Sequence, residues 1–512
     1  MLKTKDASQL KFEAFKTPFE IKINRNNRWV RLSEILPWEQ LIGIYSKSMS
    51  DFGRPALDSR IAIGAMIIKT KLGLSDEETV EQISENMYMQ FFLGLEAYQE
   101  EPLFDPSLLV HIRERMGKEI LEQMNNVVVV KAVTEQENRK REKKKPNDGI
   151  KSGETKEEQK PEDNTAEGNT IEAKEEVTHK GGYVLDATVA DQYIKYPTDA
   201  ELLNDSREKS EGIIDVLYST SKLKKKPRTY RRRARKDFLL FTKKKKKTLK
   251  EVHKAVGKQL RYLDRNLKTI ANLIDKEATA IRCLEGQAYK DYLVIQEIYR
   301  QQIQMYEEKK NRCEDRIVSI HQPHVRPIVR GKQGKTVEFG SKVLAGITDG
   351  GYTLLPRMDW NAYNEGSYVI YSVEQHKKTF GYYPEVVIGD KIFITRANRK
   401  ALEELGIRLS GKSLGRKTEE KQKAENKKIL KDQKQRVRIE GKFGQGKNAY
   451  ELNKIRMRKS NTSESMVSMI FFVMNIIRYA KDVLFCPILQ IEKMLTIFRI
   501  GYALNRITYT AA

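Results

Sequence analysis

Two short apolar runs, each carrying an acidic residue, constrain the fold of this chain more than any other feature. The run from Tyr183 to Val189 is interrupted by Asp186, and the run from Pro384 ends on Asp390. A buried strand does not keep an unpaired carboxylate for stability, because burying the charge alone costs too much free energy. The two runs therefore predict strands of an α/β core whose acidic residues serve chemistry.

A third acidic residue is predicted on a helix. Arg436, Glu440 and Lys447 are separated by four and seven residues, so on an α-helix they project from one face. Carboxylates can hold divalent metal ions, while Arg and Lys can grip phosphate oxygens. Together with Asp186 and Asp390, Glu440 would form a hard-oxygen site for two Mg²⁺ or Mn²⁺ ions, as two-metal phosphoryl transfer requires. A solvated helix face is the alternative for the segment 436–447 alone.

Two competing interpretations concern the same regions. Asp349 also ends a predicted strand, but the run before Asp390 is more apolar, which favours Asp390 as the second acid. The stretch from Gly441 to Lys447 is close to a nucleotide-binding P-loop, yet Asn448 stands where a Ser or Thr should hold Mg²⁺. The glycines of this stretch also favour a break in the helix after Glu440.

Size and charge indicate a protein of several domains with an anionic partner. The chain has 512 residues, which suggests two or three domains, and a net charge of +25, which favours nucleic acid as the partner. Its three cysteines are widely spaced, which excludes a disulfide framework and fits a reducing interior. No apolar signal core begins the chain, and the apolar run 466–477 is too short to cross a bilayer, so we expect a cytoplasmic protein without a membrane partner.

Residues 1–130 are predicted to form a mostly helical domain. Alternating residues around Asn24–Asn27 suggest a hairpin that includes Trp29–Leu32. We expect a helix over Arg60–Leu72, a second opened by Ser75 as capping residue, and a third from Asp105 to about residue 124. The first two invite a helix-turn-helix interpretation, but the second is rich in Asp and Glu and would repel phosphates, which favours a core or dimer-contact role.

The remaining chain divides by composition. Residues 131–180 hold almost no apolar side chain and are predicted to be a disordered linker. Residues 181–205 and 335–485 alternate strands and helices before the helix with the last acid, which fits a ribonuclease-H-like catalytic domain. The segment 206–334 is predicted to be a helical insertion, since 204 residues separate Asp186 from Asp390. Residues 486–512 are assigned as a C-terminal tail.

The insertion carries most of the surplus positive charge. Residues 221–250 contain sixteen Lys or Arg and one acid, with Tyr and Phe interleaved. A solvated helix is the ordinary explanation for such a run, but its density favours a grip on DNA phosphates that does not read sequence. The predicted contacts are Arg231, Arg232, Arg233, Arg235 and Lys236, together with Arg436 and Lys447. The pair His321 and His324 lacks further metal ligands nearby and is interpreted as part of a loop.

The order of these residues resembles a known family. Asp186, Asp390 and Glu440, with Arg four residues before the Glu and Lys seven after it, resemble the DDE transposases of bacterial insertion sequences, in the group with the Tyr-Arg-Glu-Lys signature (insertion-sequence family four or five). This chain departs from the signature at Gln433, where the pattern has Tyr. The segments SDEETVEQISEN and FFLGL also resemble the N-terminal domain of that group, which implies binding to terminal inverted repeats.

The sequence therefore predicts a bacterial, nucleoid-associated DNA transposase that cleaves DNA and transfers strands with two Mg²⁺ or Mn²⁺ ions. Its expected partners are double-stranded DNA, both transposon ends and target, and a second copy of the chain in a homodimer. A metal-dependent nuclease without strand transfer and a catalytically inert DNA-binding derivative are the alternatives. Gln433 is the only hint of the inert form.

Overall fold

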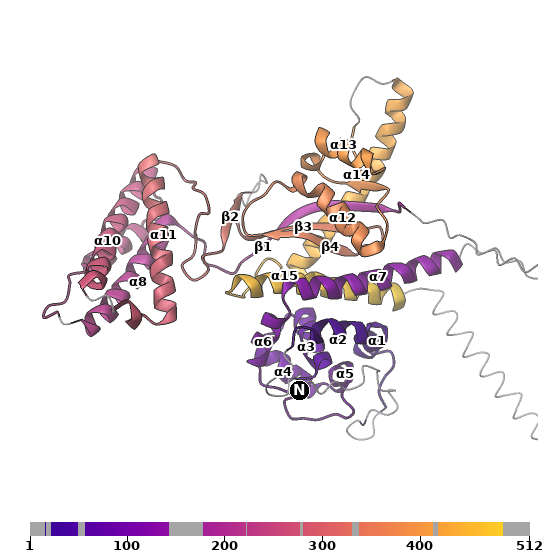
Figure 1. Ribbon diagram of the computed structural model, residues 1–512, viewed down its shortest axis with the longest axis horizontal. Coiled ribbons are helices and arrows are strands. Elements are labelled where there is room, and N and C mark those ends of the chain that lie inside the picture. Colours follow the sequence, from indigo (N-terminus) through magenta and orange to yellow (C-terminus); the bar gives the residue numbers. More distant parts are fainter. Residues whose placement is uncertain are drawn as a thin grey trace, which may run out of the picture.

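The computed structural model describes residue 16 and residues 22–49, 57–142, 178–221, 223–276, 280–329, 337–412 and 418–484. These form an N-terminal helical domain, a central sheet with its helices, and a separate helical insertion, arranged side by side in Figure 1. The prediction of an α/β core with a helical N-terminal domain and a helical insertion is confirmed at this level. The predicted tail 486–512 lies outside the described residues. No described helix is both long enough and apolar enough to cross a membrane.

The N-terminal domain is helical throughout its described part. Its elements are α1 (Arg28–Ile35), α2 (Trp38–Ser46), α3 (Ser59–Leu72), α4 (Asp76–Glu85), α5 (Met87–Phe92), α6 (Leu108–Arg115) and α7 (Lys118–Glu142). The predicted stop signal and capping box are both present, because Gly73 ends α3 with a left-handed φ of 70° and the side chains of Ser75 and Glu78 cap α4 reciprocally.

Two predictions for this domain are wrong. The proposed hairpin is replaced by α1, because the Asn27 side chain accepts a hydrogen bond from the Trp29 N–H and caps a helix whose Trp29 and Val30 are buried. The single helix expected from Asp105 is two helices, since the backbone leaves helical geometry at Met116 and α7 begins at Lys118.

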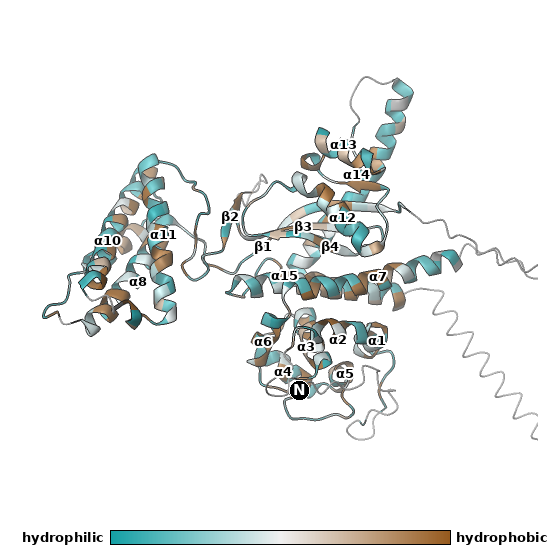
Figure 2. Ribbon diagram, viewed as in Figure 1, coloured by the Kyte–Doolittle hydropathy of each residue, from teal (hydrophilic) through white to brown (hydrophobic). Residues whose placement is uncertain are grey.

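The predicted linker also begins too early. Helix α7 continues to Glu142, and Val128, Val129 and Ala132 are fully buried. Figures 1 and 2 show α7 beside α15 (Ser460–Leu484), with the sheet on one side and the N-terminal helices on the other. The rest of the proposed linker, up to residue 177, lies outside the described residues.

The core sheet mixes antiparallel and parallel strands. Its members are β1 (Gly182–Asp191), β2 (Arg326–Val329), β3 (Val337–Thr348), β4 (Thr353–Asp359), β5 (Val386–Ile388) and β6 (Arg408–Leu409). The strand order is β2-β3-β1-β5-β6, with β4 also paired to β3. The β1–β3 and β3–β4 pairs are antiparallel, and β5 and β6 continue the sheet in parallel with β1.

Helices complete the core. They are η4 (Glu365–Tyr368), α12 (Val369–Phe380), η5 (Lys391–Phe393), α13 (Arg396–Glu404), α14 (Glu419–Ala449) and α15. Helix α15 contains the apolar run 466–477, and most side chains of that run are buried.

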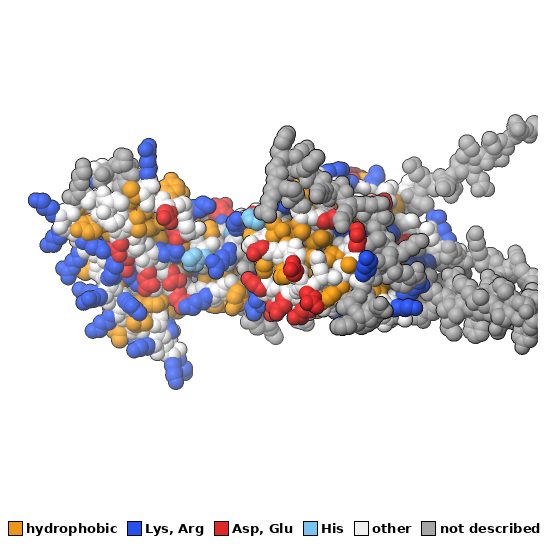
Figure 3. All heavy atoms as spheres, turned by 90° about the horizontal axis from the view of Figure 1, so that it is seen from below, with side chains coloured by type: hydrophobic (Ala, Val, Ile, Leu, Met, Phe, Trp, Pro, Cys, Tyr) orange, Lys and Arg blue, Asp and Glu red, His pale blue; other side chains and the backbone are white. Residues whose placement is uncertain are grey.

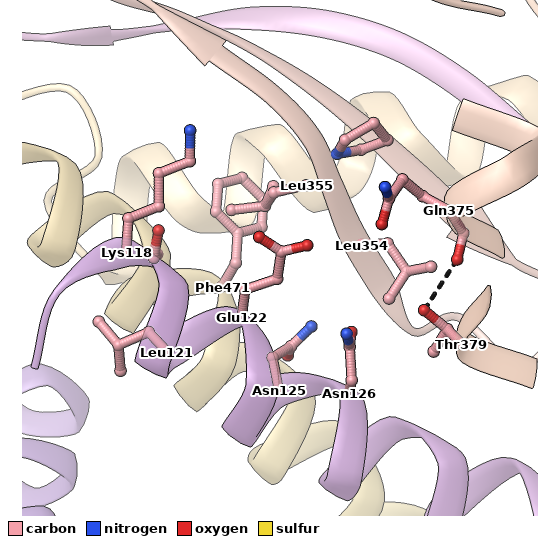
Figure 4. A pocket seen from close by; sticks show the side chains of 12 residues that line it. Lys118, Leu121, Glu122, Asn125, Asn126, Leu354, Leu355, Gln375, Thr379 and Phe471 are labelled. Carbon is pink, nitrogen blue, oxygen red and sulfur yellow. Dashed lines mark hydrogen bonds between the residues drawn. The ribbon is translucent and has the colours of Figure 1, made fainter. Parts of the chain in front are cut away.

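The junction between α7, α15 and the sheet is polar at its centre. The Asn475 side chain accepts from the Thr353 N–H and donates to the Thr353 carbonyl and to Asn125. Figure 4 shows a small adjoining pocket where Asn125 and Glu122 on α7 lie near Leu354 and Leu355 on β4. These hydrogen bonds join α7 of the N-terminal domain to the sheet and to α15.

The insertion between β1 and β2 has its own hydrophobic core. Its elements are α8 (Asp199–Thr220), α9 (Arg231–Thr242), α10 (Leu249–Lys276), η3 (Ala280–Cys283) and α11 (Gly286–Glu308). The predicted boundary at residue 206 falls inside α8, which Thr198 caps. The helix opened by Thr198 therefore belongs to the insertion, because Leu203, Ile214 and Leu217 on α8 pack in its core.

Candidate nucleic-acid cleavage site

Two neighbouring parallel strands bring Asp186 and Asp390 together. Val184 on β1 pairs with Ile388, the last residue of β5, and Asp390 follows two residues later, close enough for its charge to raise the pKa of Asp186. The Asp390 carboxylate accepts a hydrogen bond from the Lys391 N–H at 2.7 Å and caps η5. Asp186 accepts from the Ala187 N–H at 2.8 Å. The two predicted acids thus lie close together, one on β1 and the other just after β5.

Helix α14 supplies the third acid and a cation between the acids. Arg436 Nη1 lies 3.4 Å from Asp390 Oδ1, and its Nη2 lies 3.4 Å from Glu440 Oε1. The side chains of Asp390 and Glu440 are 54% and 57% exposed, so the site is open to a large substrate. Arg436 is the cation that these two carboxylates share.

The electrostatics of Asp186 differ from those of its partners. Burial raises the pKa of the Asp186 carboxyl, and nearby Glu440 and Asp390 raise it further. The Ala187 N–H and Arg436 act in the opposite direction without cancelling the effect of burial. Charged Asp186 is therefore destabilised, and an additional cation beside it would be stabilising.

The donors at this site fit a divalent metal in kind. Three carboxylates present only oxygen ligands, which Mg²⁺ and Mn²⁺ prefer. In the part of the chain that the structure describes, no three His, Cys, Asp or Glu side chains are grouped closely enough to form a ready cage. Arg436 provides the positive charge shared by Asp390 and Glu440, so a metal ion would replace an ion-pair partner as well as bind ligands.

The rival acid Asp349 has a different position and role. Its carboxylate accepts a hydrogen bond from the Gly182 N–H at 2.9 Å, at the start of β1 and four residues before Asp186. Gly181 beside it has φ of 70°, a backbone conformation that favours glycine. Asp349 therefore holds the chain where it enters the sheet, and Asp390 is the acid that the fold places beside Asp186.

Helix α14 continues past Glu440 through all three glycines. The break expected after Glu440 and the P-loop interpretation are both inconsistent with helix up to Ala449. Lys447 lies further along the same helix, but its amino group is 3.2 Å from the Glu338 carboxylate on β3. Lys447 thus has an ion-pair partner within the protein. Its contact with phosphate stays a prediction.

The basic residues of the insertion fall into two groups. Arg231 is paired with Asp215 through both ends of its guanidinium, at 3.0 and 2.8 Å. The other four predicted contacts on α9 are exposed: Arg232, Arg233, Arg235 and Lys236. Figure 3 shows Lys and Arg side chains over the insertion. The exposed four are available to an anion, whereas Arg231 joins α9 to α8.

The N-terminal helix pair has the opposite charge. Asp76 at the start of α4 pairs with the nearly buried Lys69 and Arg113, while Glu77, Glu78, Glu81 and Glu85 are exposed. Figure 3 shows acidic side chains gathered over the N-terminal domain on the same side of the molecule. This arrangement is consistent with the expected core role for α4 and is unfavourable for insertion into a DNA groove.

Other candidates have simple structural roles, and one feature has no sequence signal. The His324 ring packs edge-on against Trp360 at 4.4 Å, and burial lowers its pKa to about 4, which fits a loop residue. Tyr193 and Tyr196, just beyond β1, are 62% and 65% exposed. No periodicity or motif distinguishes these tyrosines, and only their exposure does.

Comparisons with known proteins cover two parts of this chain. A family model described as "Transposase DDE domain" matches residues 387–477, which include Asp390 and Glu440. A second, described as "Transposase domain (DUF772)", matches residues 17–115. The matched segments lie in the part of the chain with the sheet and in the N-terminal domain, and both are similar to transposase domains. The resemblance to the DDE transposases of bacterial insertion sequences is confirmed.

One curated relative is similar over part of the chain. It is the "Uncharacterized protein ORF8 in nfe locus" of Rhizobium meliloti, 35% identical over 114 residues, which are 22% of this chain and 55% of that protein. The chain thus spans about half the length of this relative. No solved structure matches the chain.

Proposed function

We propose that this protein is a DDE transposase that binds the terminal inverted repeats of an insertion sequence, cleaves DNA there and transfers the strands to a target. One observation carries the proposal. Asp186 and Asp390 from parallel strands and Glu440 from a helix converge around Arg436, although 204 residues separate the first two. A structural role does not explain this cluster, because two of its carboxylates face solvent and the third is partly buried with a raised pKa.

The sheet supports a ribonuclease-H-like core. Three antiparallel strands, β4, β3 and β1, are followed by β5 and β6 parallel to β1, with α14 packed against β1 and β5. In this arrangement the first acid is on the central strand, the second follows the next parallel strand, and the third comes from a helix on the sheet. The fold thereby brings together residues that are remote in sequence.

We assign Asp186, Asp390 and Glu440 as ligands of two Mg²⁺ or Mn²⁺ ions. When bound, such ions activate a water or 3′-hydroxyl and stabilise the leaving oxygen of the phosphodiester. Binding of a metal ion would stabilise the charged form of Asp186, because burial disfavours that charge in the protein alone. Arg436, released from its two carboxylates, could then turn its guanidinium to a phosphate beside the cut.

The exposed cations of α9 would bind the DNA backbone away from the cut, and the N-terminal domain would bind the transposon ends. Lys447 could join the phosphate contacts once its pair with Glu338 opens. Two ends per element support a homodimer, and a DNA substrate supports association with the nucleoid. Gln433 is exposed on α14 three residues before Arg436, so replacement of the signature Tyr leaves the carboxylate cluster intact.

The decisive experiment compares Asp186→Asn with Asp349→Asn in a single-turnover assay on end-containing DNA with Mg²⁺ or Mn²⁺. Asp186→Asn should lower cleavage by at least about a thousandfold, because the metals lose a charged ligand, while DNA affinity stays equal or rises slightly. Asp349→Asn retains an acceptor for the Gly182 N–H and should cleave normally.

Four outcomes would contradict parts of the proposal. Cleavage by the Asp186→Asn protein would exclude Asp186 as a metal ligand. Cleavage without joining would indicate the alternative nuclease, and neither reaction with intact DNA binding would indicate the inert derivative. Full activity in excess EDTA would exclude the two-metal mechanism altogether.

A further inference from the structure

A groove of about 620 Å³ lies where the insertion joins the core. It is bounded by the segment 193–197 leaving β1, the returning segment 318–322, the N-terminal half of α8 and the loop at Arg456 and Arg458. This size is ample for a nucleotide. The groove is separate from the carboxylate site, since β1 passes from Asp186 to Asp191 before reaching it.

Two exposed aromatic rings line the groove. Tyr193 and Tyr196 are 62% and 65% exposed. Both line the same groove, three residues apart, and give it a large aromatic surface. The Tyr196 ring stands edge-on to Phe339 at 5.5 Å, and the Lys454 amino group lies 5.0 Å from the centre of the Tyr193 ring. Each ring thus has one neighbouring side chain against it and remains mostly exposed to solvent.

The backbone under the rings is also held in place. The Tyr193 N–H donates to the Ile455 carbonyl at 2.8 Å, and the Gln192 N–H donates to the Phe339 carbonyl at 2.7 Å. A platform of this kind loses little conformational entropy when a flat ligand stacks on it.

The charges of the groove favour an anionic ligand at one wall. The acids of α8 are compensated in part, because Glu201 pairs with Lys195 and Glu208 with Arg207. On the opposite wall Arg458 is exposed and makes no ion pair within the described residues. The groove thus combines aromatic faces with an unpaired cation, as nucleic-acid strands require.

A buried amide supplies a second, independent sign of a ligand. Gln322 lines the groove and is only 6% exposed, yet its side-chain oxygen has no hydrogen-bond partner within the described structure. A buried acceptor without a partner costs about 1–3 kcal/mol. Within a groove, a ligand with an N–H or O–H group would remove this cost.

The groove lies within reach of a DNA strand bound at the carboxylates. Tyr193 lies seven residues after Asp186, two of them beyond the end of β1, so the chain between them spans at most about 23 Å at roughly 3.3 Å per residue. That length corresponds to about seven nucleotides of a stacked strand at 3.4 Å each. A strand cut at the carboxylates can therefore reach the two tyrosines.

We propose that this groove binds an unpaired nucleotide of the DNA strand, with its base stacked on Tyr193 or Tyr196 and its phosphate near Arg458. The proposal rests on the proposed function only for the origin of the strand. Binding of single-stranded DNA at this groove can be measured without any cleavage.

The test uses two probes of equal charge, a 20-nucleotide oligothymidylate and an abasic 20-mer with the same phosphates. The full chain should bind the oligothymidylate about 5- to 100-fold more tightly, because only that probe can stack. The double variant Tyr193→Ala and Tyr196→Ala should lose most of this preference with an unchanged salt dependence, since no cation is removed. The matched double Phe variant should keep it.

Tyr371→Ala is the control, because Tyr371 is 49% exposed but lies on α12, away from the groove. An unchanged preference in the double Ala variant would overturn the proposal, as would a Phe variant no better than the Ala variant. A duplex probe of the same length is measured as well. If the double Ala variant loses equal affinity for the duplex and the single-stranded probe, the groove contacts paired DNA instead. If the double Ala variant loses its preference for oligothymidylate but the wild type cleaves no DNA, the proposed groove is supported and the transposase function is contradicted.

Discussion

Arg436 is the cation that neutralises the exposed carboxylates of the candidate site. It shares its guanidinium between Asp390 and Glu440 at 3.4 Å from each, and both carboxylates are more than half exposed. Because exposed pairs are each worth only about 0–1 kcal/mol, a divalent ion can displace the guanidinium easily. The same residue can therefore neutralise the two carboxylates and later contact phosphate.

The first prediction follows from this competition. Arg436→Gln should bind Mn²⁺ more tightly, by up to about fivefold, because two carboxylates lose a competing cation. Cleavage of DNA should nevertheless fall, since glutamine cannot replace the charged guanidinium beside a phosphate. Calorimetric titration with Mn²⁺ measures the affinity, and Arg438→Gln on the same helix is a suitable control because Arg438 donates to the Asp349 carbonyl instead. Weaker Mn²⁺ binding by the Arg436 variant would show that the arginine organises the site.

The second prediction concerns pH and the buried His376. Its ring packs against Tyr183, its Nδ1–H donates to the Tyr382 carbonyl, and burial lowers its pKa to about 4. The unfolded chain, with the ordinary pKa of 6.5, therefore binds a proton more readily than the folded chain between pH 6.5 and pH 4. The free energy of unfolding should fall as the pH falls through this window, by at most about 3 kcal/mol from this residue.

Denaturant unfolding at several pH values measures this effect. His376→Gln keeps a donor for the Tyr382 carbonyl but cannot titrate, so its stability should change less between pH 6.5 and pH 4. His321→Gln, on an exposed segment, should follow the wild type. Parallel curves for all three proteins would show that His376 is not protonated on unfolding in this range.

Helix α9 shows how one basic run contains residues with different roles. Arg231 joins α9 to α8 through Asp215, while Arg232, Arg233, Arg235 and Lys236 face solvent. The third prediction is that replacing these four by Gln lowers affinity for all DNA sequences alike. The slope of log K against log salt should shrink by about 0.9 for each phosphate that the variant no longer neutralises.

Salt titrations of DNA binding test the third prediction. Arg231→Gln should instead destabilise the insertion, with a smaller change in the salt slope, because its charge is already paired. Single-turnover cleavage at saturating protein should survive in the fourfold variant. If its salt slope equals that of the wild type, the run is only a solvated helix.

At the scale of the whole molecule, the described chain contains two large hydrophobic cores. One joins the N-terminal helices to the sheet and α15, and the other belongs to the insertion. Asn475, with no exposed surface, bonds both Thr353 and Asn125 and so connects the two parts of the first core. These cores should unfold as separate cooperative units.

The fourth prediction is that calorimetry resolves two transitions and that Asn475→Ala lowers only one. The substitution leaves the buried Thr353 N–H without its partner, which should cost about 1–3 kcal/mol. Asn448→Ala, at an exposed position on α14, should leave both transitions in place. A shift of both transitions by the Asn475 variant would mean that the insertion and the core unfold together.

The sequence by itself predicted several local elements and pointed to three acids, Asp186, Asp390 and Glu440. Local sequence signals located α3 and α4, and apolar runs located β1 and β5, because these signals act over a few neighbouring residues. It failed at Trp29–Leu32, where an alternating pattern suggested a strand but the Asn27 cap and burial against α5 made a helix. It also failed where α7 continues into a polar segment, because packing against α15 outweighs composition.

Only the tertiary structure decided how distant residues combine. Parallel pairing of β1 with β5 brings Asp390, which follows β5, near Asp186, while Asp349 binds the Gly182 N–H, and no local pattern contains that arrangement. Packing of α14 on β1 and β5 keeps Glu440 at the site despite the glycines that follow it. The division of basic residues into paired Arg231 and its exposed neighbours, and the groove at Tyr193, likewise arise from long-range contacts. Sequence specifies which groups are available, and the folded chain specifies which of them meet, because contact energies act through space and not along the chain.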